Sequence, residues 1–294
     1  MTAPSHDPVL LEESVLFLRP ERGGTYVDCT LGLGGHTEAL VSRGATRVIG
    51  IDRDAEALAI AKERLGPVAG RVELVHADYR TLPAVLSKRG ITAVDGILAD
   101  LGVSSLQFES EGRGFSFRRD EPLDMRMDRS SGPTAADLVN AARETELADV
   151  IFRYGEDRQS RRIARAIVAS RPVTTTGALA AIVRRAIPGR GWQRIDPATR
   201  TFQALRIWVN GELEDLDTFV RRAAGHLAPA ARLCVISFHS LEDRIVKHTM
   251  RGLASEENEL RILTKKPIVP DDAEVGRNPR ARSAKLRAIE RQVA

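Results

Sequence analysis

The sequence predicts an α/β fold in which a Rossmann-like sheet is interrupted by a helical insertion domain. The first hundred residues alternate short β-branched runs with helical patterns, a rhythm typical of a parallel, doubly wound sheet. After Asp100 this rhythm stops, and from Thr134 to about Asn210 the pattern is helical throughout. A strong strand signal returns at Arg232. A sheet whose chain leaves after the fourth strand and returns for the fifth accounts for all three observations.

The individual elements follow from hydrophobic periodicity. Short apolar runs predict strands at residues 25–29, 47–51, 72–76, 94–99 and 232–238. Helical patterns predict helices at residues 35–42, 54–65, 80–88, 211–226 and 241–250. Two further extended segments, 260–264 and 284–290, are separated by Pro267 and Pro270.

The break after Asp100 defines the expected domains. We assign residues 1–107 and 211–294 to the sheet-containing core, and residues 108–210 to a mostly helical inserted domain. The insertion leaves at the carboxyl edge of the fourth strand, where open α/β sheets bind their ligands. We therefore expect the inserted domain to serve substrate recognition.

The composition indicates a cytoplasmic protein. The 294 residues are 43% hydrophobic and 29% charged, without an apolar run long enough to cross a membrane. Residues 1–13 carry acids and lack the apolar core of a signal peptide. Cys29 and Cys234 lie far apart in apolar runs, which predicts buried thiols, and the histidines show no ligand spacing. We expect no metal site.

Positive charge is concentrated in two regions, which favours a nucleic-acid partner. Residues 151–210 contain twelve arginines against three acids. A second basic cluster near the C-terminus comprises Arg277, Arg280, Arg282, Lys285, Arg287 and Arg291. The alternative is a general bias toward arginine, but a general bias would not explain why the excess is regional.

A glycine-rich turn follows the first predicted strand and opens a helix. Glycines allow the backbone to approach a ligand closely and to adopt positive φ; here they are Gly32, Gly34 and Gly35. Asp52, at the end of the second strand, can accept hydrogen bonds from both ribose hydroxyls of a nucleoside. Thr37 occupies the third glycine position of the dinucleotide-binding pattern, and Asp28 lies four residues before Gly32. An acid there can accept a bond from the ammonium group of S-adenosylmethionine and would repel a pyrophosphate, so a methyltransferase is favoured over a dehydrogenase.

Two more strand ends carry candidate residues. Asp78 or Tyr79 is placed to flank an adenine ring, on which an aromatic side chain could stack. Asp100 ends the fourth strand and is our candidate catalytic carboxylate, assisted by Ser104 or Ser105. A carboxylate that accepts a hydrogen bond from an exocyclic amine lets the nitrogen rehybridise and attack in line, and holding the two reacting atoms in line should supply most of the rate.

The ordered motifs resemble those of the bacterial ribosomal RNA cytosine-N4 methyltransferases of the RsmH (MraW) type, which modify the small-subunit decoding region. The resemblance runs almost end to end. It includes the stretches at 6–12, 34–36, 51–54, 100–107, 113–117, 122–128, 154–156, 201–207, 237–244, 277–280 and 282–287. One departure is Glu121, where the family pattern Asp-Gly-Pro-Leu-Asp has glycine.

The resemblance implies a class I S-adenosylmethionine-dependent methyltransferase. The residues implied to contact the methyl donor are Gly34, Gly35, His36, Asp52, Tyr79, Asp100 and Gln107. It also implies 16S ribosomal RNA or the small ribosomal subunit as partner, and it is compatible with a homodimer. Because Asp100 is implied to contact the donor, it could serve the cofactor as well as, or instead of, the cytosine.

The sequence therefore predicts an enzyme that methylates N4 of one cytidine in small-subunit ribosomal RNA. The alternatives are a methyltransferase acting on DNA cytosine or a small amine, and a non-catalytic RNA-binding assembly factor. His239 and Asp243 could orient the base or ribose, or could cap and pack a helix. Among the aromatic residues, only Trp192 is expected to be exposed for stacking on RNA.

Overall fold

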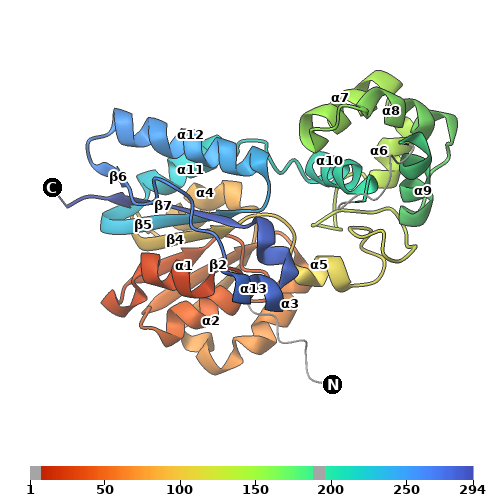
Figure 1. Ribbon diagram of the computed structural model, residues 1–294. Helices are drawn as coiled ribbons and strands as arrows, with labels where there is room; N and C mark the ends of the chain where they lie inside the picture. The colour runs from red at the N-terminus through yellow and green to blue at the C-terminus, as the bar shows by residue number, and fades with distance from the viewer. Residues whose placement is uncertain (1–7, 188–195, 294) are drawn as a thin grey trace. The chain divides into compact units, whose positions relative to one another are not determined.

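The computed structural model describes residues 8–187 and 196–293 and confirms the α/β fold (Figure 1). The chain forms two compact units. The sheet unit comprises Met1–Gly102 and Asp215–Ala294, and the helical unit comprises Val103–Glu214. The divisions lie a few residues outside the expected ones at 107/108 and 210/211. The helical unit thus takes in the segment directly after the fourth strand.

A seven-stranded sheet organises the sheet unit, in the order β3-β2-β1-β4-β5-β7-β6. The strands are β1 Thr25–Asp28, β2 Arg47–Asp52, β3 Val72–His76, β4 Val94–Asp100, β5 Leu227–Ser237, β6 Leu260–Ile262 and β7 Lys285–Arg291. The first five strands are parallel to one another, whereas β7 runs antiparallel to both β5 and β6. The central strands are buried on both faces because helices cover both sides, which explains their continuous apolar runs.

Strand β5 begins five residues before its predicted start at Arg232. Its pairing with β4 is irregular: Val94 is opposite Leu227, but Gly96 is opposite Arg232. Ala230 lies in the left-handed region with φ 64°. The extra residues form a bulge, and the prediction, which relied on the apolar run at residues 232–238, did not extend across it.

Seven α-helices of the sheet unit are described, and two of them, α1 and α13, were not predicted. The helices are α1 Leu11–Leu18, α2 Gly35–Ser42, α3 Ala55–Arg64, α4 Leu82–Ser87, α11 Leu216–Gly225, α12 Ser240–Glu256 and α13 Asp272–Arg277. Helix α11 is shorter than expected, since residues 211–215 lie outside it. Short 3₁₀ turns η1 Pro20–Arg22, η2 Gly66–Arg71, η3 Tyr79–Thr81 and η4 Pro279–Ser283 complete the unit.

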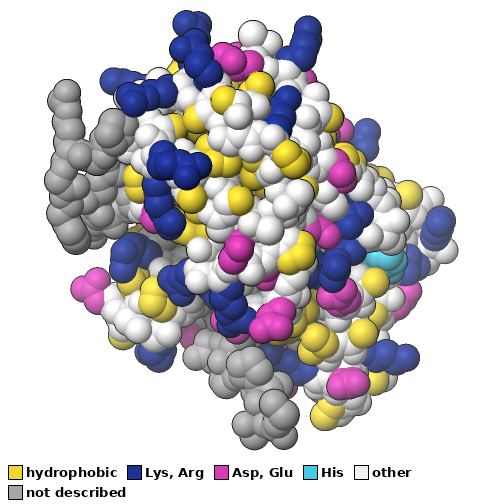
Figure 2. Space-filling model, turned by 90° about the vertical axis from the view of Figure 1, so that its right-hand side faces the viewer, with side chains coloured by type: hydrophobic (Ala, Val, Ile, Leu, Met, Phe, Trp, Pro, Cys, Tyr) yellow, Lys and Arg dark blue, Asp and Glu magenta, His cyan; other side chains and the backbone are white. Residues whose placement is uncertain are grey.

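The helical unit packs its helices around its own apolar core. The helices are α5 Ser105–Glu109, α6 Ala135–Ala141, α7 Glu144–Gly155, α8 Ser160–Ala169, α9 Thr176–Ala186 and α10 Ala198–Asn210. Leu147, Ile151, Ile163 and Leu205 are among the core residues that are fully buried. Arginine and lysine side chains project from the face of the molecule that Figure 2 shows.

The irregular segment of residues 110–133 is fixed by hydrogen bonds. Buried Arg113 donates to the carbonyl of Met127 over 3.0 Å, and Asn210 bonds the backbone of Met125 and Met127 over 2.8 Å. Glu121 accepts bonds from the amides of Gly112 (2.7 Å) and Gly114 (3.1 Å). This chain therefore uses the Glu121 side chain to close a loop at the position where the resemblance predicts glycine.

No helix in the described ranges is long and apolar enough to cross a bilayer.

Candidate functional site

Three carboxylates mark the ligand-binding edge of the sheet. Asp28, Asp52 and Asp100 are the last residues of β1, β2 and β4. Strands β1 and β4 are neighbours at the point where the strand order reverses. Open α/β sheets bind ligands outside the carboxyl ends of their strands at this switch point. The sheet thus gathers the acids that the sequence separates by up to 72 residues, from 28 to 100.

The turn after β1 depends on two glycines in the left-handed region. Gly32 (φ 52°) donates its amide to Asp52 Oδ2 over 2.7 Å, which joins the turn to the end of β2. Gly34 (φ 81°) is the N-cap of α2, where a Cβ atom would lie 2.8 Å from Leu65 Cδ1. Gly35 is helical, and its small size serves a different purpose, because a Cβ there would meet Pro8 Cγ at 2.4 Å. The turn therefore needs glycine for backbone conformation at two positions and for space at the third.

Asp28 holds the turn from inside. Its side chain is 1% exposed and accepts bonds from the Thr37 hydroxyl (2.8 Å) and the Thr30 amide (3.3 Å). Burial raises the pKa of Asp28 to about 6, although both hydrogen bonds oppose this shift. Through these bonds Asp28 anchors α2 and the turn. Its direct contact with the ammonium group of the cofactor stays a prediction.

His36 is held in one orientation by the N-terminal segment. Its Nε2 lies 3.1 Å from the carbonyl oxygen of Val9, and its Nδ1 lies 4.0 Å from Asp100 Oδ2. Burial lowers the pKa of His36 to about 4, so the ring is neutral near pH 7. The amide of Leu10 donates to Glu274 Oε1 of α13 over 2.8 Å, which fastens the same segment from the other side. Sequence reasoning missed Glu274, because no local pattern relates it to residues at the other end of the chain.

Asp100 lies at the centre of the group. Its amide donates to Thr30 Oγ1 over 2.6 Å, which joins the ends of β1 and β4. Its side chain is 24% exposed, yet Oδ1 is buried and has no hydrogen-bond partner among the described residues. Desolvation raises the pKa of Asp100 well above its usual range, and the charges of Asp28, Glu242 and Glu274 add to the shift.

The electrostatics of this edge suit a cationic ligand. Desolvation raises the pKa values of Asp28, Asp52 and Asp100, so each is costly to ionise without a nearby positive charge. A ligand with positive charge would stabilise the ionised carboxylates and so offset the free energy of ionising them. Its hydroxyl or ammonium groups would supply hydrogen-bond donors for Asp100 Oδ1 and for Asp52. S-adenosylmethionine has these groups: a sulfonium, an ammonium and two ribose hydroxyls. The residues therefore fit this cofactor.

Tyr79 lies three residues after the end of β3, at the start of η3. Its ring packs edge-on against Phe219, with centroids 4.6 Å apart, and the Arg80 guanidinium lies 5.9 Å from its centroid. The neighbouring Asp78 is bound by Arg80 over 2.7 Å and approached by Arg53 at 3.7 Å. Desolvation of Asp78 is outweighed by these contacts, and its pKa is lowered. Asp78 is thus engaged by two arginines, and Tyr79 is the residue of the two whose side chain can stack on an adenine ring.

Ser104 and Gln107, two of the predicted site residues, lie in the helical unit. Ser104 is the N-cap of α5: its hydroxyl accepts from the Gln107 amide (3.3 Å), and Gln107 Oε1 accepts from the Ser104 amide (3.0 Å). This reciprocal capping box fixes both side chains at the start of α5. Their roles toward cofactor and substrate stay predictions.

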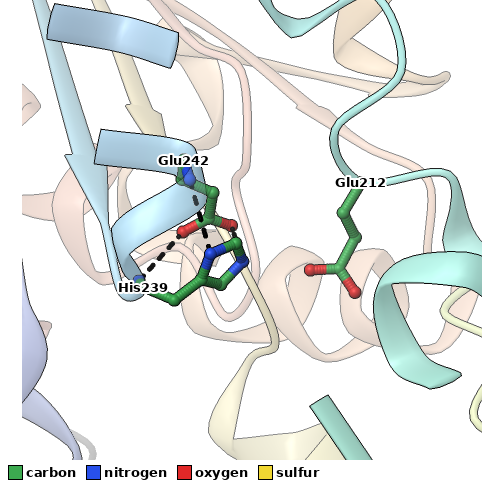
Figure 3. A group of neighbouring side chains, drawn as sticks. All are labelled: Glu212, His239 and Glu242. Atoms are coloured by element: carbon green, nitrogen blue, oxygen red, sulfur yellow. Dashed lines mark hydrogen bonds and ion pairs between the residues drawn. The ribbon is translucent and has the colours of Figure 1, made fainter. Parts of the chain in front are cut away.

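His239 and Asp243 make structural contacts. His239 caps α12 and forms a capping box with Glu242, whose carboxylate lies beside the His239 imidazole in Figure 3. Asp243 pairs with Arg287 over 2.6 Å and with Lys285 over 3.4 Å. Glu212, also drawn in Figure 3, belongs to the helical unit and pairs there with Arg206 over 2.7 Å. The capping and packing alternative for His239 and Asp243 is the one that these contacts support.

The aromatic residues of the helical unit are mostly part of its core. Phe115 is 5% exposed, Phe117 packs against Phe202, and Trp208 packs against the same core. Trp192, predicted to be exposed, lies outside the described residues, as do His6, Arg190 and Arg194. Cys29 and Cys234 are buried free thiols, as expected.

The family model described as the MraW methylase family matches residues 3–292. The chain belongs to this family. Among its relatives, Ribosomal RNA small subunit methyltransferase H of Gloeobacter violaceus is 52% identical, over 97% of this chain and 88% of the relative. The proteins of the same name from Bradyrhizobium diazoefficiens and Nitratidesulfovibrio vulgaris (strain DP4) are 49% and 50% identical, over 100% and 99% of this chain and 94% and 98% of theirs.

Membership of the MraW methylase family agrees with the chemistry of the sheet edge. The matched region includes the glycine turn and all three carboxylates, so the features described above lie within the shared part of the chain. The resemblance stated from the motifs is thereby confirmed over nearly the whole sequence.

Proposed function

We propose that this MraW-family chain transfers a methyl group from S-adenosylmethionine to N4 of a cytidine in the decoding region of 16S ribosomal RNA. The relatives are named as small-subunit ribosomal RNA methyltransferases, which supports this class of substrate. The observation that carries the proposal is the group of three strand-end carboxylates with raised pKa values, beside a glycine turn and a fixed neutral histidine.

The cofactor supplies an electrophilic methyl group when bound. Asp52 would accept bonds from the ribose hydroxyls, and Tyr79 would stack on the adenine. Gly34 and Gly35 would bring the backbone close to the cofactor, and Gln107 would add a contact from α5. Asp28 and Asp100 would stabilise its positive charges across a partly dehydrated site, where electrostatic interactions are stronger than in water.

Asp100 also suits the acceptor side of the reaction. Its side chain is partly exposed, so the carboxylate can also accept a hydrogen bond from the cytosine amine, and this bond would hold the nitrogen with its lone pair toward the methyl group. We propose Ser104 as a second contact to the base. The helical unit, with its excess of arginine, would hold the surrounding RNA, and the target base would be flipped out of its stack to reach the site.

The decisive experiment is mass spectrometry of ribosomal RNA from a strain lacking this protein. We expect N4-methylcytidine to disappear from the decoding region and to return when the wild-type protein is supplied. Unchanged N4-methylcytidine would overturn the proposal. Transfer of labelled methyl groups to DNA but not to small subunits would favour a different substrate, and failure of the intact protein to bind S-adenosylmethionine in calorimetry would favour a binding factor without catalysis.

A cytoplasmic location and a homodimer stay predictions. Fractionation of cells tests the first, and sedimentation equilibrium of the purified protein tests the second.

A further inference from the structure

Helix α8 of the helical unit carries a row of exposed arginines. Arg161, Arg162 and Arg165 lie on the solvent side of the helix, at spacings of three and four residues that place them together, and Arg158 is exposed just before its start. The opposite side of α8 is apolar, and Ile163 is among its fully buried residues. Rotation of α8 about its axis would bring its buried apolar residues into solvent, so the arginines are held on the exposed side. We call Arg158, Arg161, Arg162 and Arg165 the α8 arginine row.

Carboxylates do not neutralise this row. Arg165 lies 3.6 Å from Glu144, but the two side chains are 78% and 43% exposed, so water screens the pair. In the described ranges 8–187 and 196–293, Arg158, Arg161 and Arg162 make no ion pair. The nearest acid in sequence, Asp157, is 6% exposed and accepts the backbone amide of Gln159 over 2.8 Å.

The arrangement is unfavourable for the free protein. Arg161 and Arg165 are like charges four residues apart on one helix, which destabilises a helix. Arg161 and Arg162 also lie in the first turn of α8, which has no acidic residue, and the helix dipole disfavours positive charge there. A polyanion bound along the row would relieve both kinds of repulsion.

We propose that the α8 arginine row binds the sugar-phosphate backbone of the RNA substrate, an inference that rests on the proposed function. Guanidinium groups bind phosphate oxygens through paired hydrogen bonds, and such contacts fix the position of an RNA without reading its sequence. The row therefore anchors and positions the RNA, and the choice of cytidine is made elsewhere.

The test compares the full-length wild-type protein with a variant in which the four arginines of the row are replaced by glutamine. The probe is an RNA fragment of the small-subunit decoding region, and its dissociation constant is measured over a range of salt concentrations. We expect the variant to bind at least about tenfold more weakly near 0.1 M salt. The logarithm of the binding constant falls linearly with the logarithm of the salt concentration, and each phosphate contact on single-stranded RNA contributes about 0.7 to the magnitude of that slope. We therefore expect the magnitude of the slope to be smaller by about 2 to 3 in the variant.

A matched control removes the same charge elsewhere. Arg43, Arg221, Arg222 and Arg251 are exposed in the sheet unit, and their replacement by glutamine also lowers the net charge by four. We expect this control to keep most of the wild-type affinity and slope. Equal losses in the two variants would show a general charge effect and overturn the proposal, as would an unchanged slope in the row variant.

A second measurement does not depend on the quadruple variant. The natural cysteines are buried, so Arg162→Cys provides a selectively reactive thiol for a photo-crosslinker. We expect this thiol to crosslink to the labelled RNA fragment, and we expect an excess of unlabelled RNA to suppress the crosslink. Absence of crosslinking would contradict the proposal. The proposal would also be overturned if the glutamine variant of the row bound RNA as the wild type does but lost binding to anionic lipid vesicles or to an acidic polypeptide.

The outcome can be separated from that of the proposed function. S-adenosylmethionine binding by calorimetry is expected to be the same in the wild type and in both variants. If the wild type methylates small subunits and the row variant binds RNA normally, only the row proposal fails. If the wild type binds RNA through the row but methylates no ribosomal RNA, only the proposed function fails.

Discussion

The imidazole of His36 donates its Nε2 proton to the carbonyl oxygen of Val9 over 3.1 Å. A carbonyl can only accept a hydrogen bond, so this contact selects the Nε2–H tautomer of the neutral ring. Nδ1 is then an acceptor directed toward the side of Asp100, 4.0 Å from Oδ2. Val9 is adjacent to Leu10, which Glu274 holds. A chain of contacts thus runs from α13 through the N-terminal segment to the proposed cofactor site.

Replacing Glu274 by alanine should loosen this chain of contacts. The amide of Leu10 would lose its acceptor, which we expect to cost about 1–2 kcal/mol of stability and to weaken S-adenosylmethionine binding through misplacement of His36. Glu274→Gln keeps an acceptor oxygen and should restore both properties. Thermal unfolding and calorimetry provide the measurements. Equal cofactor affinity in Glu274→Ala and the wild type would show that the segment does not position His36.

Asp100→Asn should impair both cofactor binding and transfer. The substitution keeps the size of the side chain but removes the negative charge and the acceptor capacity of one oxygen. We expect kcat/KM to fall by a factor of about 100 or more, a typical effect of losing a positioned proton acceptor. Labelled methyl transfer to small subunits measures the loss. Activity within a few-fold of the wild type would remove Asp100 from the catalytic role.

Asp28 should make the free protein less stable as the pH rises. Its pKa rises from 3.8 to about 6 on folding, because the folded protein holds the proton more tightly than the unfolded chain. The contribution of this protonation to the free energy of unfolding is therefore fully present below pH 3.8 and is lost as the pH rises through 6. The shift corresponds to about 3 kcal/mol, since one pKa unit is worth about 1.4 kcal/mol. Asp28→Asn should therefore increase stability at pH 8 by up to this amount, while weakening cofactor binding.

Urea unfolding at pH 5 and pH 8 measures this trade-off, with the exposed Asp217→Asn as a control that should change little at either pH. In the wild type, cofactor affinity should fall as the pH drops through 6, because a cation binds best to ionised carboxylates. Cofactor affinity that rises on acidification would contradict this electrostatic account.

Gly34 and Gly90 form a matched pair for testing the turn. Both have positive φ, 81° and 65°, but only a Cβ at Gly34 meets another residue, the buried Leu65. Gly90→Ala should cost about 1 kcal/mol from backbone strain alone. Gly34→Ala should cost more and should reduce cofactor affinity, which Gly90→Ala should leave intact. Equal effects of the two substitutions on calorimetric affinity would argue against a special role for the turn.

Glu121→Gly introduces the residue that the resemblance predicts and removes the acceptor of two amides, those of Gly112 and Gly114. We expect the helical unit to lose about 1–3 kcal/mol of stability, whereas Glu121→Gln, which keeps one acceptor oxygen, should lose less. Hydrogen exchange at residues 110–125 provides a local measurement. Unchanged protection in Glu121→Gly would show that the loop is held by its other contacts.

The sequence by itself determined the parts of the protein that depend on local pattern. Hydrophobic periodicity located the parallel strands. Because the carboxyl ends of parallel strands share one edge of a sheet, the strand pattern alone assigned Asp28, Asp52 and Asp100 to one site. The start of β5, where the pairing with β4 is irregular, and the short helices α1 and α13 escaped this reasoning.

Only the tertiary structure decided which groups bond to one another. Thr37 binds Asp28 across a turn, and Glu274 binds Leu10 across 264 positions of sequence. Such contacts depend on where the packed core brings distant backbone together, and periodicity carries no information about that. The same holds for charge: the sequence counts the arginines of residues 151–210, but burial of one side of α8 decides which of them form a row in water.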